Sequence, residues 1–210
     1  MGGHFLQETA LRELESGMRQ IPGFSPRRSG IIRGRPEQMQ PAPYGELVRF
    51  FLAEIPPSRL TVRIINLKSR GEVKEFMFRS GQHKKRFREI CGNGDYVSLC
   101  ADHGRAAALF LLSADTFLWD RAKTCITKDG IRYKEMAVHG IEPDGYALLC
   151  AAKEMCGGRP GLSLSELGDP ELISDRLLQV ILSGILISRH GIGITAEKEE
   201  KKGRGPEKKC

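Results

Sequence analysis

The apolar run from Asp169 to Ser188, near the C-terminal end, constrains the fold of this chain more than any other stretch. Its large apolar residues recur at spacings of three and four, the pattern of a helix face that is buried in a core. Asp169 is a favourable N-cap residue, and Pro170 suits the first helical position, where a missing N–H has no intrahelical partner. We therefore predict one largely buried helix here, too short and too polar at its start to span a membrane.

Helical spacing of apolar residues also appears in other segments, most of which begin at a favourable capping residue. Ser80 precedes one of them, and the Pro143–Asp144 pair begins another. Pro56–Pro57 ends the first segment, because proline cannot continue a helix. We predict helices over residues 44–55, 81–91, 105–112, from the Ser113–Asp115 cap to Cys125, and over 143–155.

One segment has the composition of a β-strand. Leu60–Leu67 is rich in β-branched residues and roughly alternates at its start, which is typical of strands. Glu72–Phe78 lies just beyond the turn-like Lys68–Gly71 and is the nearest partner for it. We therefore expect a small β-hairpin within an otherwise mainly α-helical protein.

The net charge of +7 is unevenly distributed along the 210 residues. Residues 1–90 carry 17 lysines and arginines against 9 acidic residues, whereas residues 91–195 carry 10 against 13. This contrast favours a neutral or mildly acidic folded unit with basic attachments. We predict a basic, partly disordered N-terminal segment over 1–76, a compact helical domain over 77–192 and a disordered charged tail over 193–210.

The composition, with 40% hydrophobic and 28% charged residues, is that of a globular protein with some disordered length. Residues 1–4 lack the basic segment and the following apolar run of a signal peptide, so we expect a cytoplasmic location without membrane attachment. In that compartment the six cysteines are expected to be reduced thiols, most of them buried.

The basic residues of the front half are candidates for nucleic-acid contact. Arg27, Arg28, Arg33 and Arg35 fall within nine residues, and no acidic residue occurs between Glu15 and Glu37. Arginines on a flexible arm can neutralise phosphates and release counterions, which gives salt-sensitive binding without sequence preference. The simpler alternative is a solvated basic linker that has no ligand.

A second group of cations lies in the predicted helix over 81–91. Lys84, Lys85 and Arg88 belong to the run His83–Arg88, and helical spacing puts these three on one side. They would extend the electropositive surface or bind an acidic partner. A solvated helix face is the alternative here as well.

The residues that bind metals or perform catalysis show no established motif. Cys91, Cys100 and His103 are spaced as C-x8-C and C-x2-H, which lacks the paired short spacing of zinc sites. We therefore assign no metal, no cofactor and no catalytic residue. A hydrolase or transferase with a site built from His83, His139 or His190 and nearby acids is the alternative from another functional class.

A set of core and turn residues between 77 and 192 resembles an uncharacterised family of short bacterial proteins associated with conjugative and other mobile elements. The resemblance implies a compact, mainly helical domain of unknown activity, and it offers no catalytic residues to carry over. Residues 1–76 depart from the family and are either a fused module or sequence from a neighbouring reading frame. The matching positions are Met77-Phe78, His83-Lys84, Arg86-Phe87, Ala108–Asp115, Leu118-Trp119, Asp129–Ile131, Asp144–Leu148, Leu164–Leu167, Asp169 and Leu172.

From these features we expect a non-enzymatic cytoplasmic accessory protein of a mobile element. It would bind a protein partner and contact nucleic acid non-specifically through its basic arm. The residues expected to make the nucleic-acid contact are Arg27, Arg28, Arg33, Arg35, Lys84, Lys85 and Arg88.

Overall fold

The computed structural model describes residues 42–73, 75–158 and 161–195. Contacts divide the chain into the units Met1–Ala42 and Pro43–Cys210, and the description below concerns the second unit. Within the described ranges, no helix has the length and apolar character needed to cross a membrane.

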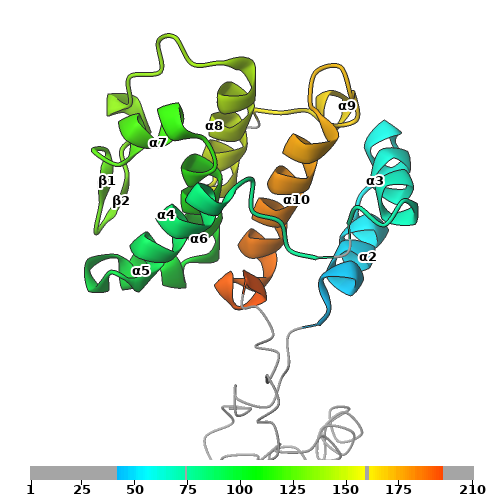
Figure 1. The fold of residues 1–210 in the computed structure, drawn as a ribbon, viewed down its shortest axis with the longest axis horizontal. Helices are drawn as coiled ribbons and strands as arrows, with labels where there is room; N and C mark the ends of the chain where they lie inside the picture. The colour runs from blue at the N-terminus through cyan, green and yellow to red at the C-terminus, as the bar shows by residue number, and fades with distance from the viewer. Residues whose placement is uncertain (1–41, 74, 159–160, 196–210) are drawn as a thin grey trace, which may run out of the picture. The chain divides into compact units, whose positions relative to one another are not determined.

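The second unit is mainly α-helical, as predicted (Figure 1). In Figure 1, α10 stands between α2 and α3 on one side and the helices α4 to α8 on the other. The α-helices are α2 (Tyr44–Glu54), α3 (Arg59–Ser69), α4 (Gly81–Gly92), α5 (Val97–Ala101), α6 (His103–Ser113), α7 (Thr116–Ala122), α8 (Pro143–Met155), α9 (Leu164–Leu167) and α10 (Asp175–His190). Short 3₁₀ helices are η2 (Gly94–Tyr96), η3 (Tyr133–Glu135) and η4 (Ile192–Thr195), and the strands are β1 (Ile126–Thr127) and β2 (Gly130–Ile131).

The core is built around the pair α6 and α10, with α8 packed on the other side of α6. Every residue of α6 from Ala106 to Ser113 is buried. Gly184 of α10 faces Leu111 of α6 so closely that a Cβ atom on the glycine would lie 2.8 Å from the leucine Cδ2. The absence of a side chain at Gly184 therefore allows these two helices to approach each other.

The predicted central helix is confirmed, but its start is wrong. The helix begins at Asp175, where the Ser174 side chain accepts a hydrogen bond from the Leu177 N–H. Asp169 instead accepts a hydrogen bond from the Glu171 N–H through its Oδ1 and forms a local turn. The Ile173 carbonyl accepts from the Arg63 side chain, so it is engaged in a tertiary contact just before the helix. The predicted end is confirmed, because Gly191 follows His190 with φ of +79°.

The predicted strand over Leu60–Leu67 is wrong, because these residues belong to α3. Ser58 caps the helix by accepting from the Thr61 N–H, and Leu60, Ile64 and Leu67 face inward at helical spacing. Exposed Val62 and Ile65 lie between them, which made the segment resemble an alternating strand.

A small antiparallel hairpin does exist, but at another place in the chain. Strands β1 and β2 pair Ile126 with Ile131 and Thr127 with Gly130. They flank the turn at Lys128–Asp129, and Gly130 has a positive φ of +156° that favours glycine. The expectation of a hairpin is therefore met, although not by the segments that we proposed for it.

The unit begins at Pro43 rather than at residue 77, since α2 and α3 pack with the C-terminal helices. The Tyr44 hydroxyl lies 3.1 Å from the Ser183 Oγ of α10, and the Met77 N–H donates to the same oxygen at 3.3 Å. Burial raises the Tyr44 pKa to about 12. The segment that we expected to be loosely structured therefore contributes two helices to the described unit.

Candidate functional site

An apolar groove of about 780 Å³ lies among helices α2, α6, α8, α9 and α10. Its floor includes Phe51, Leu60 and Ile181, all of which are buried. Leu164 stands at its edge and leaves 39% of its surface exposed. The other apolar lining residues are Ile55, Ala151, Met155, Leu162, Leu167 and Ile185.

The groove exists because several elements end around it. Helix α2 stops at Glu54, before Pro56–Pro57, so Phe51 and Ile55 lie at its last turn. Helix α8 ends at Met155, after which Gly157 adopts a φ of +76°. The chain turns away at both ends and leaves apolar side chains that no further element covers within the described residues.

Charged side chains border the apolar groove, and most of them are paired. Asp102 and Arg105 lie 3.7 Å apart, and Arg189 forms an ion pair with Glu54 while its guanidinium lies 5.0 Å from the centre of the Phe51 ring. Glu154 also lines the groove, and no ion pair joins it to any described residue. The border therefore has one unpaired negative charge.

Cys156 is the thiol of the apolar groove. The Tyr133 hydroxyl lies 3.1 Å from the Ala152 carbonyl oxygen, to which it donates, and 3.5 Å from the Cys156 Sγ. Burial raises the pKa of the Cys156 thiol, and thiolate is the nucleophilic form of cysteine. This environment therefore does not activate Cys156 as a nucleophile.

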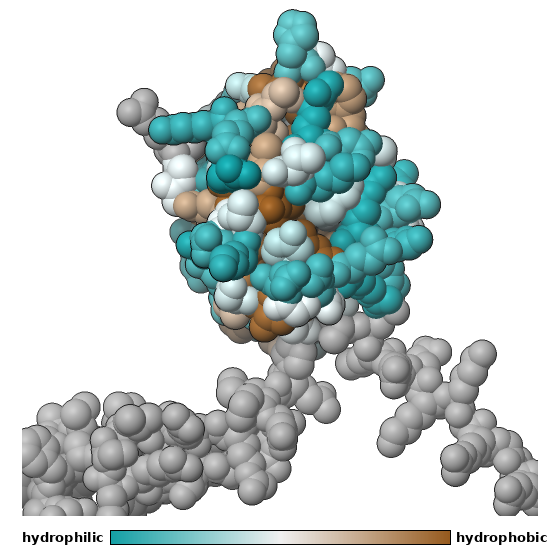
Figure 2. Space-filling view, turned by 90° about the vertical axis from the view of Figure 1, so that its left-hand side faces the viewer, coloured by the Kyte–Doolittle hydropathy of each residue, from teal (hydrophilic) through white to brown (hydrophobic). Residues whose placement is uncertain are grey.

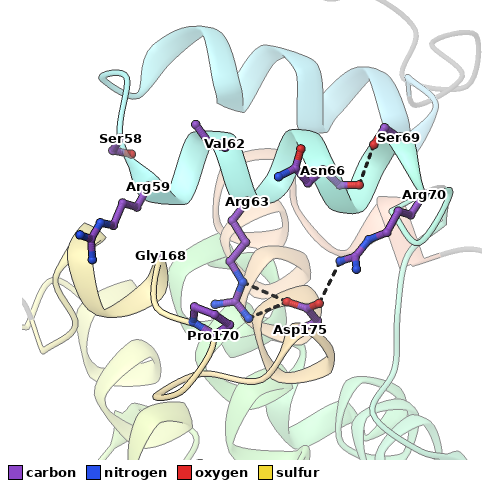
Figure 3. A pocket seen from close by; sticks show the side chains of 10 residues that line it. All are labelled: Ser58, Arg59, Val62, Arg63, Asn66, Ser69, Arg70, Gly168, Pro170 and Asp175. Carbon is purple, nitrogen blue, oxygen red and sulfur yellow. Dashed lines mark hydrogen bonds and ion pairs between the residues drawn. The ribbon is translucent and has the colours of Figure 1, made fainter.

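A second hollow, the arginine groove, lies between α3 and the segment that precedes α10 (Figure 3). It has a volume of about 880 Å³. Arg59, Arg63, Asn66 and Arg70 follow one stripe of α3 at helical spacing, and all four line it. Gly168, Pro170 and Asp175 form part of the opposite side.

The arginine groove is dominated by contacts within the protein. Arg63 is only 8% exposed, and it donates from Nε and Nη2 to the Asp175 Oδ1 at 3.0 and 2.7 Å. It also donates to the carbonyl oxygens of Leu167 at 3.0 Å and Ile173 at 2.5 Å. Arg70 donates to the Asp175 Oδ2 at 3.0 Å, and hydrogen bonds from Arg63 and Arg70 lower the pKa of Asp175.

These contacts make Arg63 a clamp between α3 and the start of α10. Its guanidinium is held by one carboxylate and two carbonyls, which occupy the planar face that would otherwise bind a ligand. Arg59 is the one groove arginine without a hydrogen bond or ion pair to any described residue. A single unpaired arginine is a weak basis for anion binding.

The predicted nucleic-acid residues divide between the two units. Arg27, Arg28, Arg33 and Arg35 lie outside the described residues. Lys84, Lys85 and Arg88 lie on α4, opposite the buried His83, Phe87 and Ile90, so the structure brings these three cations to one side of the helix. Lys85 also lies 3.9 Å from Glu89. Figure 2 shows the side of the unit that faces left in Figure 1, where hydrophilic side chains surround a narrow apolar strip.

His83, which we listed as a candidate catalytic residue, is fully buried beside Phe78 and Phe110. Its Nδ1 accepts from the Arg79 N–H at 3.0 Å, and its Nε2 donates to the Phe110 carbonyl at 2.8 Å. This pair of bonds fixes one neutral tautomer, and burial lowers the His83 pKa to about 4. Both ring nitrogens are occupied, so His83 has a structural position.

The other candidate histidines, His139 and His190, are exposed, and no hydrogen bond or ion pair joins either to an acid among the described residues. His103 packs against Gly191, where an added Cβ would lie 2.7 Å from its Nε2. Within the described ranges, no three His, Cys, Asp or Glu side chains gather closely enough to hold a metal ion.

Comparison with known proteins gives no match to a family model, a curated protein or a solved structure. The site is therefore interpreted from its own geometry. Sequence reasoning did not find the apolar groove, because its lining comes from segments between Phe51 and Arg189 that are far apart in the chain. One local signal was present, since Leu164 stands apolar and exposed beside the polar residues Ser163 and Ser165.

Proposed function

We propose that this protein is a non-enzymatic, cytoplasmic accessory protein of a mobile element that binds a protein partner through the apolar groove. The partner segment that fits is an amphipathic helix. The observation that carries the proposal is a groove with a buried apolar floor, a partly exposed apolar edge and a charged border. Helices bind such grooves by inserting side chains spaced at i, i+3, i+4 and i+7.

The charges at the border give the partner helix a preferred composition. Asp102 pairs with Arg105, and Glu54 pairs with Arg189, so these four charges are balanced. Glu154 remains without an ion pair among the described residues. A lysine or arginine beside the apolar stripe of the partner would meet this carboxylate, which sets orientation and specificity more than affinity.

The second part of the proposal concerns nucleic acid. Lys84, Lys85 and Arg88 share one side of α4, where they suit contacts to phosphates. Together with Arg27, Arg28, Arg33 and Arg35 they would give binding that is independent of sequence and falls steeply with salt. This part is tested by fluorescence anisotropy of labelled duplex and single-stranded DNA and RNA, with the full chain and with the Lys84→Gln, Lys85→Gln, Arg88→Gln triple variant.

The alternative of a histidine-based hydrolase or transferase receives less support from the geometry. His83 has both ring nitrogens occupied by backbone groups. A general base needs a nitrogen within reach of the substrate proton, which His83 does not offer. For these reasons we favour binding over catalysis.

The groove is tested with a fluorescein-labelled amphipathic peptide of about five helical turns. Its leucines follow i, i+3, i+4 and i+7 and its other residues are lysines, and a matched peptide carries glutamates instead. We expect the lysine peptide to bind more tightly although the protein has a net charge of +7, because Glu154 is the unpaired charge at the groove. Leu164→Glu should weaken its binding at least about tenfold, which corresponds to about 1.4 kcal/mol.

Leu172→Glu is the matched control, since Leu172 is 59% exposed and does not line the groove. It should bind the lysine peptide as the unchanged protein does. Glu154→Gln should narrow the preference for the lysine peptide. Equal binding by the Leu164 and Leu172 variants would contradict the proposal. An apolar dye that binds in the groove while neither peptide does would indicate a small apolar ligand instead.

A further inference from the structure

Two thiols that the proposed function does not use lie side by side where α4 meets α5. The Sγ atoms of Cys91 and Cys100 are 3.2 Å apart. Cys91 is half-buried near the end of α4, and Cys100 is buried in α5. The chain between them runs through Gly92, Asn93 and the short helix η2, which folds α5 back toward α4.

This geometry is close to that of a disulfide. The sulfur atoms would need to approach by roughly 1 Å to reach the S–S bond length of about 2.0 Å. Gly92 and Gly94 lie in the connecting segment, and neither would meet another atom within 4 Å if it carried a Cβ. The segment therefore has room to move as the two sulfur atoms approach each other.

The electrostatics of the pair favour one reactive thiolate. The hydrogen bond between the two thiols lowers the pKa of Cys100, because the Cys91 S–H stabilises the Cys100 thiolate. The same interaction raises the pKa of Cys91. Half-buried Cys91 gives a small oxidant a path to the pair, whereas Cys125 and Cys150 are buried away from solvent.

We infer that Cys91 and Cys100 are a modification site at which a peroxide forms a disulfide within the folded protein. One thiolate attacks a peroxide oxygen, which breaks the O–O bond, forms a sulfenic acid and releases hydroxide that becomes water on protonation. The second sulfur then attacks the sulfenic sulfur, forms the S–S bond and expels the hydroxyl group, which leaves as water with the proton of the second thiol. Two thiols and one hydrogen peroxide thus give one disulfide and two waters.

The disulfide would join the end of α4 to α5. It would close a short loop and restrict the unfolded chain, which stabilises the folded state. Helix α4 also carries Lys84, Lys85 and Arg88, so the modification would fix the helix that presents these cations. This inference is independent of the apolar groove and of the proposed partner.

The test uses the full chain treated with hydrogen peroxide, then blocked with an alkylating agent, digested and analysed by mass spectrometry. Trypsin leaves both cysteines in one peptide, Glu89–Arg105, which should lose the mass of two hydrogen atoms. A protease that cleaves before aspartate cuts at Asp95, between the cysteines, and should yield two peptides that separate only after reduction. We also expect the melting temperature to rise by several degrees and to return with reductant.

Cys91→Ser and Cys100→Ser should each abolish the linked peptides, whereas Cys156→Ser should leave them unchanged. The same oxidation in urea is a control for the folded geometry, since the unfolded chain should form mixed pairs among its cysteines. The inference fails if folded protein yields Cys91 or Cys100 only as sulfinic acid, or pairs them with other cysteines. It also fails if the linkage forms no faster in the folded chain than in the unfolded one.

Discussion

The two grooves of this protein lie close to each other but differ in what their walls have left to bind. They are separated by the contact of α3 with the end of α9, where a Cβ on Gly168 would lie 2.8 Å from the Leu60 nitrogen. In the arginine groove, the buried guanidinium of Arg63 is already bound by Asp175 and by two carbonyl oxygens. In the apolar groove, Phe51, Leu164 and Ile185 line a hollow that no described element covers.

This difference shows that the volume and charge of a hollow do not identify a binding site. The arginine groove is the larger of the two, yet its central cation acts as a clamp that attaches α3 to α10. The apolar groove is less conspicuous in the sequence, but its apolar surface is still exposed to solvent. What matters is whether the groups in the wall already have partners.

The largest effect is expected from removing the clamp. Arg63→Ala should lower the free energy of unfolding by about 3 kcal/mol, because the Leu167 and Ile173 carbonyls lose their donor. Arg63→Lys should recover only part of this loss, since a lysine ammonium cannot reproduce the planar set of contacts. Urea unfolding followed by circular dichroism measures both variants.

Asp175→Asn is the matched variant on the other side of the clamp. It should cost about 1 kcal/mol or less, because the Asp175 side chain is 38% exposed and its ion pairs are screened by solvent. If Asp175→Asn destabilises the protein as much as Arg63→Ala does, the ion pair rather than the carbonyl contacts holds α3, and our reading of the clamp is wrong.

His83 is a second interior polar group whose bonding capacity is filled, and it predicts a pH dependence. Its folded pKa of about 4 lies below the ordinary 6.5, so the unfolded chain binds more protons between these values. The stability is therefore fully present above about pH 6.5 and falls as the pH decreases toward 4, by about 3 kcal/mol in total. Urea unfolding between pH 7 and 4 measures this loss.

The titration of the His83 ring, followed by nuclear magnetic resonance, gives an independent check. A midpoint near 4 is expected, while a midpoint near the ordinary value would contradict the buried neutral tautomer. Asp175 contributes in the opposite range of protonation, because its lowered pKa makes its share of stability disappear only as the pH falls through the folded pKa. Its contribution therefore survives at pH values where that of His83 is already being lost.

Much of the helical content follows from local signals in the sequence. The caps at Ser80 and Asp115, the proline at the start of α8 and the glycine after His190 each lie at a helix boundary that we predicted. These signals depend on neighbours within one helical turn, so they can be identified without the tertiary structure. The prediction of a buried C-terminal helix succeeded for the same reason.

The errors arose where a distant residue decides the local structure. The start of α10 is placed by Ser174 after a turn whose Ile173 carbonyl binds Arg63, a residue more than a hundred positions away. Leu60–Leu67 is a helix because its buried side faces α9 and α10 across contacts that the segment itself does not encode. His83 was placed among candidate bases because its aromatic neighbour Phe110 comes from another helix. The apolar groove was missed on the same grounds.

A medium effect should separate stability from binding at the apolar groove. Leu164→Ala removes a side chain that is 39% exposed, so it should change the free energy of unfolding by less than about 1 kcal/mol. The same variant should weaken binding of the lysine peptide severalfold, because the exposed edge is part of the contact surface. Isothermal calorimetry and urea unfolding measure the two quantities, and a loss of stability without a loss of binding would make Leu164 a core residue.

The smallest effect is expected at Arg59, the unpaired arginine of the arginine groove. Arg59→Ala should change the free energy of unfolding by no more than about 0.5 kcal/mol, because the side chain has no hydrogen bond or ion pair with any described residue. Inorganic phosphate should raise the melting temperature of the unchanged protein and of this variant equally. A stabilisation by phosphate that disappears only with Arg59→Ala would show that the arginine groove binds anions. The contrast between a filled and an open groove would then no longer hold, and the clamp of Arg63 would form one wall of a second binding site.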